Sequence, residues 1–140
     1  MEKIIKQLKS KLDNNNIDFA FIGSVALWLR GVKIDPDDID IVTDDVGVKK
    51  ASSIFGSKLI FKRGFWETYF DLKNIPVQIL SYQNNPVREF DFASEKELVG
   101  RNNQKYPCMS LDSELKVYRE LNRTDDQNTI KIIKKLIKNN

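Results

Sequence analysis

The spacing of apolar side chains in the first thirty residues predicts a helix, a strand and a second helix. Residues 2–16 place apolar side chains on one helical face and lysines elsewhere, which indicates an amphipathic helix. Residues 17–22 form a short apolar run typical of a strand, and Gly23 ends it. We expect Ser24 to cap a short helix that runs to about Arg30.

The central part of the chain alternates between strand-like and helix-like periods. Residues 38–42 alternate with period two, which is the pattern of a strand. A helix capped by an aspartate is expected over residues 46–55. Three strands are then predicted in a row, at residues 58–62, 66–72 and 75–81. Lys73 and Asn74 separate the last two strands, which indicates a hairpin.

The pattern is weakest in the segment that follows these strands. Residues 87–92 are expected to form an edge strand, although Pro86 weakens that pattern. Residues 94–97 resemble a helical capping box, but only a short helix fits before Gly100. Residues 94–109 therefore give the least definite prediction in the chain.

Two helices are predicted at the end of the chain. Ser110 begins the first, which runs to about Asn122. Residues 124–127 form a capping box for the second, which runs to about Lys138 with lysines on its polar side. Since no repeat, linker or composition shift is present, residues 1–140 are expected to form one α/β or α+β domain.

The composition narrows the chemistry that is open to the chain. It contains no histidine, which excludes Ser-His-Asp and Cys-His nucleophiles and imidazole metal sites. The lone Cys108 excludes an internal disulfide and cysteine-rich zinc clusters. Any catalytic metal is thus expected to be a hard ion held by oxygen, Mg²⁺ or Mn²⁺. No apolar run is long enough for a membrane span and no signal peptide is evident, so we expect a cytoplasmic location and no membrane partner.

Four residues combine into a candidate nucleotide site. Gly23 lets the backbone approach a ligand closely, and Ser24 offers a hydroxyl at a helix N-terminus, where unpaired N–H groups favour phosphate. Asp38 and Asp40 are two positions apart on a strand, so both carboxylates project from one face. The negative charges of two such carboxylates repel each other unless a cation binds between them. The combination predicts binding of a nucleoside triphosphate through Mg²⁺.

Each of these features also has an ordinary structural interpretation. Gly-Ser after a strand is a common turn, and Asp-x-Asp alone is a weak motif. The aspartates between residues 35 and 40 also fit a solvated acidic loop that enters an amphipathic strand. The order and spacing of the features, rather than any one of them, favour the nucleotide site.

The same residues resemble the signature of the nucleotidyltransferase superfamily that includes DNA polymerase beta. Residues 21–31, with the sequence FIGSVALWLRG, and Asp38-Ile39-Asp40-Ile41 carry the match. The branch resembled is the small bacterial and archaeal one, which includes antibiotic nucleotidyltransferases and nucleotidyltransferase-like toxins and antitoxins. The resemblance implies a mixed β-sheet core flanked by helices, with two C-terminal helices.

The resemblance also implies an activity. A protein of this family binds a nucleoside triphosphate such as ATP with Mg²⁺ and transfers the nucleoside monophosphate to a hydroxyl acceptor. Asp38 and Asp40 match the catalytic, metal-binding aspartates of the family, and Gly23 and Ser24 match its phosphate cradle. The acceptor is not identified by the sequence, and RNA, a protein and a small molecule all stay open.

One position departs from the family pattern. The family has a third carboxylate on a later strand, where it binds the catalytic metal and helps to deprotonate the attacking hydroxyl. Residues 76–80 match that strand, and Gln78 stands in place of the acid. Glutamine offers a neutral oxygen to a metal but cannot act as a base. The chain is therefore expected to be either an enzyme or a catalytically degenerate binding module, such as an antitoxin-like or partner subunit.

The neighbouring strand offers a substitute for the missing acid. A two-residue turn after Leu72 would set Tyr69 opposite Gln78, with Glu67 and Asp71 as diagonal neighbours on the same face. Glu67 has the longer reach and would replace the acid. The preferred interpretation of Glu67 and Asp71 is nevertheless that of ordinary hairpin charges.

Basic side chains are weaker candidates. The resemblance implies that Lys116 contacts the nucleotide, and Arg123 is a second candidate for phosphate. A basic and aromatic patch for a base or for RNA would comprise Lys62, Arg63, Trp66 and Tyr69. Because a chain of this length leaves little for an acceptor domain, we expect that a homodimer or a partner protein supplies one.

Overall fold

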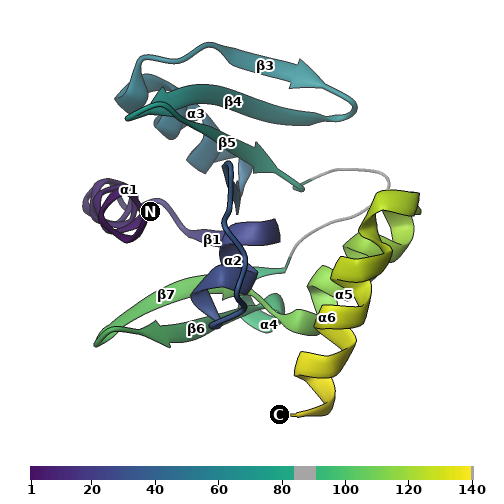
Figure 1. Cartoon of the computed structure of the whole chain (residues 1–140). Helices are drawn as coiled ribbons and strands as arrows, with labels where there is room; N and C mark the ends of the chain where they lie inside the picture. Colours follow the sequence, from purple (N-terminus) through teal and green to yellow (C-terminus); the bar gives the residue numbers. More distant parts are fainter. Residues whose placement is uncertain (84–90, 140) are drawn as a thin grey trace.

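The computed structural model describes residues 1–83 and 91–139. Within them, seven strands form one sheet with the order β3-β4-β5-β2-β1-β7-β6 (Figure 1). The strands are β1 (Phe19–Ile22), β2 (Ile39–Thr43), β3 (Leu59–Lys62), β4 (Phe65–Leu72), β5 (Ile75–Ser81), β6 (Lys96–Arg101) and β7 (Gln104–Met109). The helices are α1 (Glu2–Asn14), α2 (Gly23–Leu29), α3 (Asp45–Phe55), α4 (Phe92–Glu95), α5 (Leu111–Leu121) and α6 (Gln127–Lys138), with a 3₁₀ turn at Thr124–Asp126.

The sheet is mixed. Strands β1 and β2 are antiparallel, whereas β2 runs parallel to β5 and β1 runs parallel to β7. Antiparallel strands complete both sides, with β3 and β4 beyond β5 and with β6 beyond β7. This arrangement confirms the predicted mixed sheet flanked by helices, with two helices at the C-terminal end.

One face of the sheet, the core face, holds the main apolar core. It carries alternate strand residues such as Phe21, Ile41 and Ile79, which are fully buried. Leu8 of α1 and Ala51 of α3 belong to the same apolar cluster. Helix α1 therefore lies on the opposite side of the sheet from α5 and α6 (Figure 1).

The other face, the site face, bears Asp40 and Gln78. Strand side chains alternate between faces, so Ile39 and Ile41 on the core face leave Asp40 on the opposite one. Val42 belongs to a small buried cluster on the site face, against which Val117 of α5 packs. The end of the chain thus covers the face that carries the candidate site.

Helices α5 and α6 are held by their own apolar cluster. Leu27 of α2, Leu115 of α5 and Ile133 of α6 belong to it. Its members recur at helical spacing along α5 and α6, as the amphipathic pattern of these segments predicts. None of the helices in the described parts of the chain is long and apolar enough to cross a membrane.

The hairpin turn between β4 and β5 confirms the predicted register. Lys73 and Asn74 both have positive φ, 49° and 67°, as a tight two-residue turn requires. Leu72 consequently pairs with Ile75, and Tyr69 pairs with Gln78. The predicted elements that precede residue 82 are present, with ends that differ by a few residues.

The segment with the weakest pattern holds a hairpin that the sequence analysis missed. Strands β6 and β7 pair across Asn102 and Asn103, which have positive φ of 49° and 63°. The short helix expected after a capping box at residues 94–97 does not form, because Lys96–Arg101 are strand β6; the helix found here, α4, ends at Glu95 and has Asp91 as its N-cap. Of the edge strand predicted at residues 87–92, positions up to 90 lie outside the described residues, and Phe92 is helical.

The capping box predicted at Thr124 does not form. Residues Thr124–Asp126 make a 3₁₀ turn, and α6 begins at Gln127 without a side-chain capping hydrogen bond. Asp126 instead accepts a hydrogen bond from Arg123 Nε at 2.6 Å. The carboxylate of Asp126, which lies at the start of α6, therefore pairs with Arg123 and does not cap the helix.

We predict that Gly47→Ala destabilises the protein, although alanine is the better helix former by about 1 kcal/mol. A Cβ atom at Gly47 would meet Thr43 Oγ1 at 2.0 Å. Thr43 cannot turn away without loss, because it is buried and its hydroxyl donates to the Asp18 carbonyl at 2.5 Å. Urea denaturation is expected to show a loss of about 1–3 kcal/mol.

The control is a double-mutant cycle with Thr43→Ala. The pair Thr43→Ala/Gly47→Ala is expected to lose less stability than the sum of the two single variants, because the clash is removed. A Gly47→Ala protein as stable as the wild type would contradict the steric argument.

Candidate functional site

Two pockets open on the site face and meet at Asp40 and Gln78, which line both of them. The larger pocket has a volume of about 400 Å³, and the smaller pocket has a volume of about 330 Å³. Asp40 and Gln78 are paired across the parallel strands β2 and β5. The register of these two strands therefore fixes the junction of the pockets.

The larger pocket combines apolar walls with charged side chains of both signs, because the carboxylates of Asp40, Glu114 and Glu120 line it as well as two arginines. Its apolar lining includes Phe65, Leu80 and Val117. Arg63 and Arg123 also line it, with side chains that are 61% and 57% exposed, respectively. Such a pocket suits a ligand with an apolar ring and an anionic group, because guanidinium groups bind phosphate through paired hydrogen bonds.

Of the predicted carboxylate pair, Asp40 lies where the two pockets meet, and Asp38 lines only the smaller pocket. Asp38 is exposed just before β2 and lines the smaller pocket, whereas Asp40 is half-buried within the strand. Burial and, next, the charge of Asp38 raise the pKa of Asp40 from 3.8 to about 6. A cation between the two carboxylates would favour the charged form and reverse this shift.

Gly23 borders Asp40 directly, as the motif predicts. Its φ is +69°, in the left-handed region that favours glycine, and a Cβ atom there would lie 3.4 Å from Asp40 Oδ2. Helix α2 begins at Gly23 and has no side-chain capping hydrogen bond, so the capping role expected for Ser24 is not found. Ser24 is half-buried in the first turn of α2.

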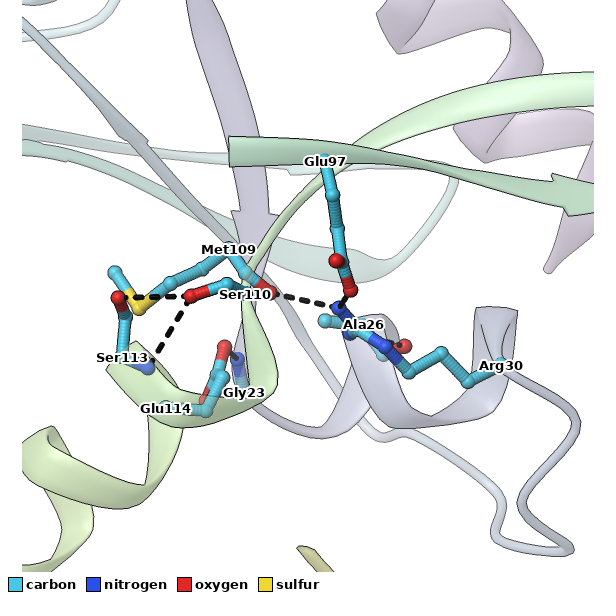
Figure 2. Close-up of polar contacts among 8 residues, drawn as sticks. All are labelled: Gly23, Ala26, Arg30, Glu97, Met109, Ser110, Ser113 and Glu114. Carbon is cyan, nitrogen blue, oxygen red and sulfur yellow. Dashed lines mark hydrogen bonds and ion pairs between the residues drawn. The ribbon is translucent and has the colours of Figure 1, made fainter. Parts of the chain in front are cut away.

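A carboxylate that the sequence analysis missed occupies the start of α2. Glu114 of α5 is only 2% exposed, and its Oε1 accepts a hydrogen bond from the Gly23 N–H at 2.9 Å (Figure 2). Burial raises the pKa of Glu114 from 4.5 to about 7, although the Gly23 N–H and the charge of Arg30 oppose the shift. The backbone donor that was expected to meet a phosphate therefore already has a protein partner.

A signal for Glu114 was present in the sequence. Leu111, Leu115 and Tyr118 mark the apolar face of α5, and position 114 lies on that same face at helical spacing. A glutamate among apolar positions is rarely buried without a partner. The identity of the partner, ninety-one positions away along the chain, was beyond a local pattern.

Arg30 fixes the chain where it passes from β7 into α5. Its guanidinium donates to the Met109 carbonyl at 2.8 Å and to Glu97 Oε1 at 2.6 Å (Figure 2). Ser110 caps α5 by accepting a hydrogen bond from the Ser113 N–H. These contacts hold the start of α5 against α2 and so help to fix Glu114 beside Gly23.

Gln78 is tied to the neighbouring strand β4. Its Nε2 donates to Tyr69 Oη at 2.9 Å and to Glu67 Oε2 at 3.2 Å. Glu67 is only 1% exposed, and Arg63 Nη2 lies 3.4 Å from Oε2. The expected placement of Glu67 on the same face as Gln78 is found, whereas its interpretation as an ordinary surface charge of a hairpin is wrong.

The basic and aromatic patch proposed for β3 and β4 is divided between the two faces of the sheet. Trp66 packs edge-on against Phe61 and belongs with the residues that pack against the core face. Tyr69 lies beside Gln78 and lines the smaller pocket together with Asp71. Strand alternation separates these aromatic side chains, so they do not form one surface.

The two basic residues that the sequence analysis named as candidates for nucleotide contact, Lys116 and Arg123, occupy different positions. Arg123 lines the larger pocket, as a phosphate-binding residue would. Lys116 is exposed on α5 and is not among the residues that line the pocket. Contact of Lys116 with a nucleotide therefore stays a prediction of the sequence alone.

The oxygen atoms at the junction fit a hard divalent cation. Within residues 1–83 and 91–139, no group of three or more His, Cys, Asp or Glu side chains is arranged to hold a metal. The donors available are the carboxylates of Asp38 and Asp40 and the amide oxygen of Gln78. Oxygen donors with a net charge of −2 match the preference of Mg²⁺ for carboxylates supplemented by water and phosphate.

We predict that Glu114→Gln makes the protein more stable than the wild type at pH 8 but not at pH 4. Because the folded pKa of Glu114 is raised, its contribution to stability is complete below pH 4.5 and is lost as pH rises through about 7. Glutamine keeps an oxygen for the Gly23 N–H. The expected difference at pH 8 is about 2–3 kcal/mol.

Urea denaturation at several pH values measures this effect. Glu120→Gln is the matched control, because Glu120 is an exposed glutamate of the same helix. A stability difference between the wild type and Glu114→Gln that does not change with pH would contradict the prediction.

The structure of this chain is similar to several solved structures. No family model matches the sequence, and no curated protein matches it significantly. A provisionally assigned nucleotidyltransferase from Thermotoga maritima superposes with a TM-score of 0.73 at 21% identity, covering 99% of this chain and 92% of that one. The lincosamide antibiotic adenylyltransferase LnuA, solved with lincomycin, gives a TM-score of 0.70 at 16% identity, covering 96% of both chains.

A third structure agrees with these two. ANT(2″)-Ia, solved in complex with adenylyl-2″-tobramycin, gives a TM-score of 0.67 at 12% identity, covering 96% of this chain and 88% of that one. At identities this low, the structural similarity establishes the fold alone, and the chemistry has to be argued from the residues of the site. The chain therefore has the nucleotidyltransferase fold, as its sequence motifs predicted.

Proposed function

We propose that this protein is a metal-dependent nucleotidyltransferase, which binds a nucleoside triphosphate with Mg²⁺ and transfers the nucleoside monophosphate to a hydroxyl group. One observation carries the proposal: Asp40, with Asp38 beside it in the smaller pocket, lies at the junction of a partly apolar pocket that contains two arginines and a second pocket. A transferase needs both a donor site and an acceptor site at one reacting centre.

The larger pocket is the proposed nucleotide site. Arg63 and Arg123 contribute positive charge for the phosphates, and the apolar lining accepts the base. Gly23 and Ser24 contribute a close backbone approach beside Asp40. Of the N–H groups there, that of Gly23 donates to Glu114, so phosphate would have to displace this carboxylate or use the next N–H groups of α2.

Asp38 and Asp40 would hold Mg²⁺ or Mn²⁺, with Gln78 as a neutral neighbour. The bound ion supplies charge neutralisation for the phosphates and polarises the phosphorus–oxygen bonds. The two aspartates position it at the junction, and Gln78 contributes an oxygen without adding charge.

In the proposed reaction, the acceptor hydroxyl oxygen forms a bond to the α-phosphorus. The bond between that phosphorus and the oxygen bridging to the β-phosphate breaks, and pyrophosphate leaves with the electron pair. Gln78 cannot accept the hydroxyl proton, so the proton passes to water. Positioning and charge neutralisation therefore supply most of the rate acceleration, and proton transfer supplies less than in an enzyme with a third carboxylate.

The smaller pocket is the proposed acceptor site. It adjoins Asp40 and Gln78, and its volume of about 330 Å³ suits a small molecule or a single unit of a larger chain. Two of the similar structures contain an antibiotic or an adenylylated antibiotic, which supports a small hydroxyl compound over RNA or protein. A homodimer or a partner protein would complete this site if the acceptor is large.

A second candidate function follows from Gln78. Without a third carboxylate, the chain would bind a nucleotide and metal but not turn over, and would act as a binding module for a partner protein. Absence of pyrophosphate release in the presence of tight nucleotide binding would favour this alternative over the enzyme.

We predict that the four nucleoside triphosphates bind only with Mg²⁺, and that Asp38→Asn/Asp40→Asn weakens binding at least about tenfold, or about 1.4 kcal/mol. The variant loses the two charges that hold the ion. Calorimetric titration with and without Mg²⁺ measures the effect.

The matched control is Asp35→Asn/Asp37→Asn, which removes two exposed carboxylates from the same loop outside both pockets. Equal losses in the two double variants would show that general charge, and not the site, governs binding. No binding of any triphosphate to the wild type would refute the proposed function.

A further inference from the structure

Where the family pattern has a third carboxylate, this chain has two side chains in contact on neighbouring strands, an amide on β5 and a carboxylate on β4. Gln78 on β5 occupies the position beside Asp40, where it lines both pockets. The nearest acidic group on the far side of Gln78 is Glu67 on β4, which is 1% exposed and lines neither pocket. An amide therefore lies beside Asp40, and the acidic side chain lies one strand further away.

The amide nitrogen of Gln78 is fully committed to β4. A side-chain amide has two N–H groups, and Nε2 donates to Glu67 Oε2 at 3.2 Å and to Tyr69 Oη at 2.9 Å. The remaining polar atom of the side chain is its carbonyl oxygen, which can only accept. Gln78 therefore offers the junction an oxygen rather than an N–H group.

The negative charge of Glu67 enforces this orientation. An ionised carboxylate has no hydrogen to donate, so it contacts the nitrogen of Gln78 and not its oxygen. A glutamine at position 67 would donate or accept equally well and would permit the Gln78 amide to turn over. Burial of Glu67 strengthens the preference, because hydrogen bonds to a charged group are stronger away from water.

Glu67 also explains why position 78 is not acidic. Two carboxylates in contact at a buried position repel each other strongly, and one of them would have to bind a proton. The pKa of Tyr69 is raised as well. The largest cause is burial, followed by the hydrogen bond of the Tyr69 hydroxyl with Glu67 and by the charge of Glu67. On its β4 side, Gln78 thus already contacts one carboxylate, that of Glu67, and a second acid in contact with it is not favoured.

We propose that Glu67 is a positioning residue, which holds the Gln78 amide so that its carbonyl oxygen becomes the third oxygen donor, with Asp38 and Asp40, for the divalent metal. This inference rests on the proposed function. It assigns the charge of the missing acid to Glu67 and its metal-facing oxygen to Gln78, so that the pair performs together what one carboxylate does elsewhere.

Titration of the metal-free protein with Mn²⁺, followed by electron paramagnetic resonance, tests the proposal. Glu67→Gln is expected to raise the Mn²⁺ dissociation constant about tenfold, as is usual when the partner of a metal ligand is removed. Glu67→Asp, which keeps the charge, is expected to recover part of that loss. Asp35→Asn is the control, because Asp35 is an exposed aspartate that lines neither pocket.

The exchanged pair gives the sharpest result. The double variant Glu67→Gln/Gln78→Glu returns the carboxylate to β5 beside Asp40 and is expected to bind Mn²⁺ at least as tightly as the wild type. Gln78→Glu alone is expected to bind less tightly than this double variant, because Glu67 then repels the new carboxylate. Equal affinity in these two variants would overturn the proposal.

A nuclear magnetic resonance measurement separates orientation from stability. The two Gln78 side-chain N–H hydrogens are expected to exchange slowly with water in the wild type and at least about tenfold faster in Glu67→Gln. If Glu67→Gln lowers the unfolding midpoint but leaves Mn²⁺ affinity and this exchange unchanged, Glu67 is structural only and the proposal fails. A wild type that binds no Mn²⁺ would instead refute the proposed function, and the metal role of Gln78 with it.

Discussion

The parallel pairing of β2 with β5 is the contact on which the candidate site depends. It sets Asp40 beside Gln78 and leaves their apolar neighbours, Ile39, Ile41 and Ile79, on the opposite face. Burial of those neighbours makes a shift in register costly, because a slip by one residue would turn the carboxylate into the core. The hydrophobic core therefore holds the polar site in position.

The site face carries several buried carboxylates, an arrangement that does not favour the stability of the folded protein. Asp40, Glu67 and Glu114 are buried or half-buried there, and the pKa values of Asp40 and Glu114 are raised by burial. Buried charges of one sign lower the free energy of unfolding unless donors or cations offset them. Asp40 and Glu114 line the larger pocket, and carboxylates with pKa values raised by burial in a pocket are typical of a functional site.

The fold and the chemistry of this protein rest on different evidence. The similar structures share the backbone arrangement at identities between 12% and 21%, which establishes the fold. The chemistry depends on a few side chains, and Gln78 departs from the family pattern at one of them. In this chain Gln78 instead contacts a buried carboxylate, Glu67, on the adjacent strand.

Local patterns determined much of this structure. The period-two alternation of residues 38–42 located β2, and the two-residue turn at Lys73 and Asn74 set the register of Tyr69 against Gln78. The order of Gly23, Asp38 and Asp40 indicated the site, because these residues lie on short elements whose directions follow from strand and turn geometry.

Only the tertiary structure decided what surrounds those residues. Glu114 reaches Gly23 from a helix ninety-one positions away, and the burial of Glu67 to 1% depends on the packing of the whole sheet. The β6-β7 hairpin pairs beside β1, and its weak alternation concealed it in the sequence. Sequence patterns report the periodicity of one segment, whereas burial, pKa and hydrogen-bond partners arise from contacts between distant segments.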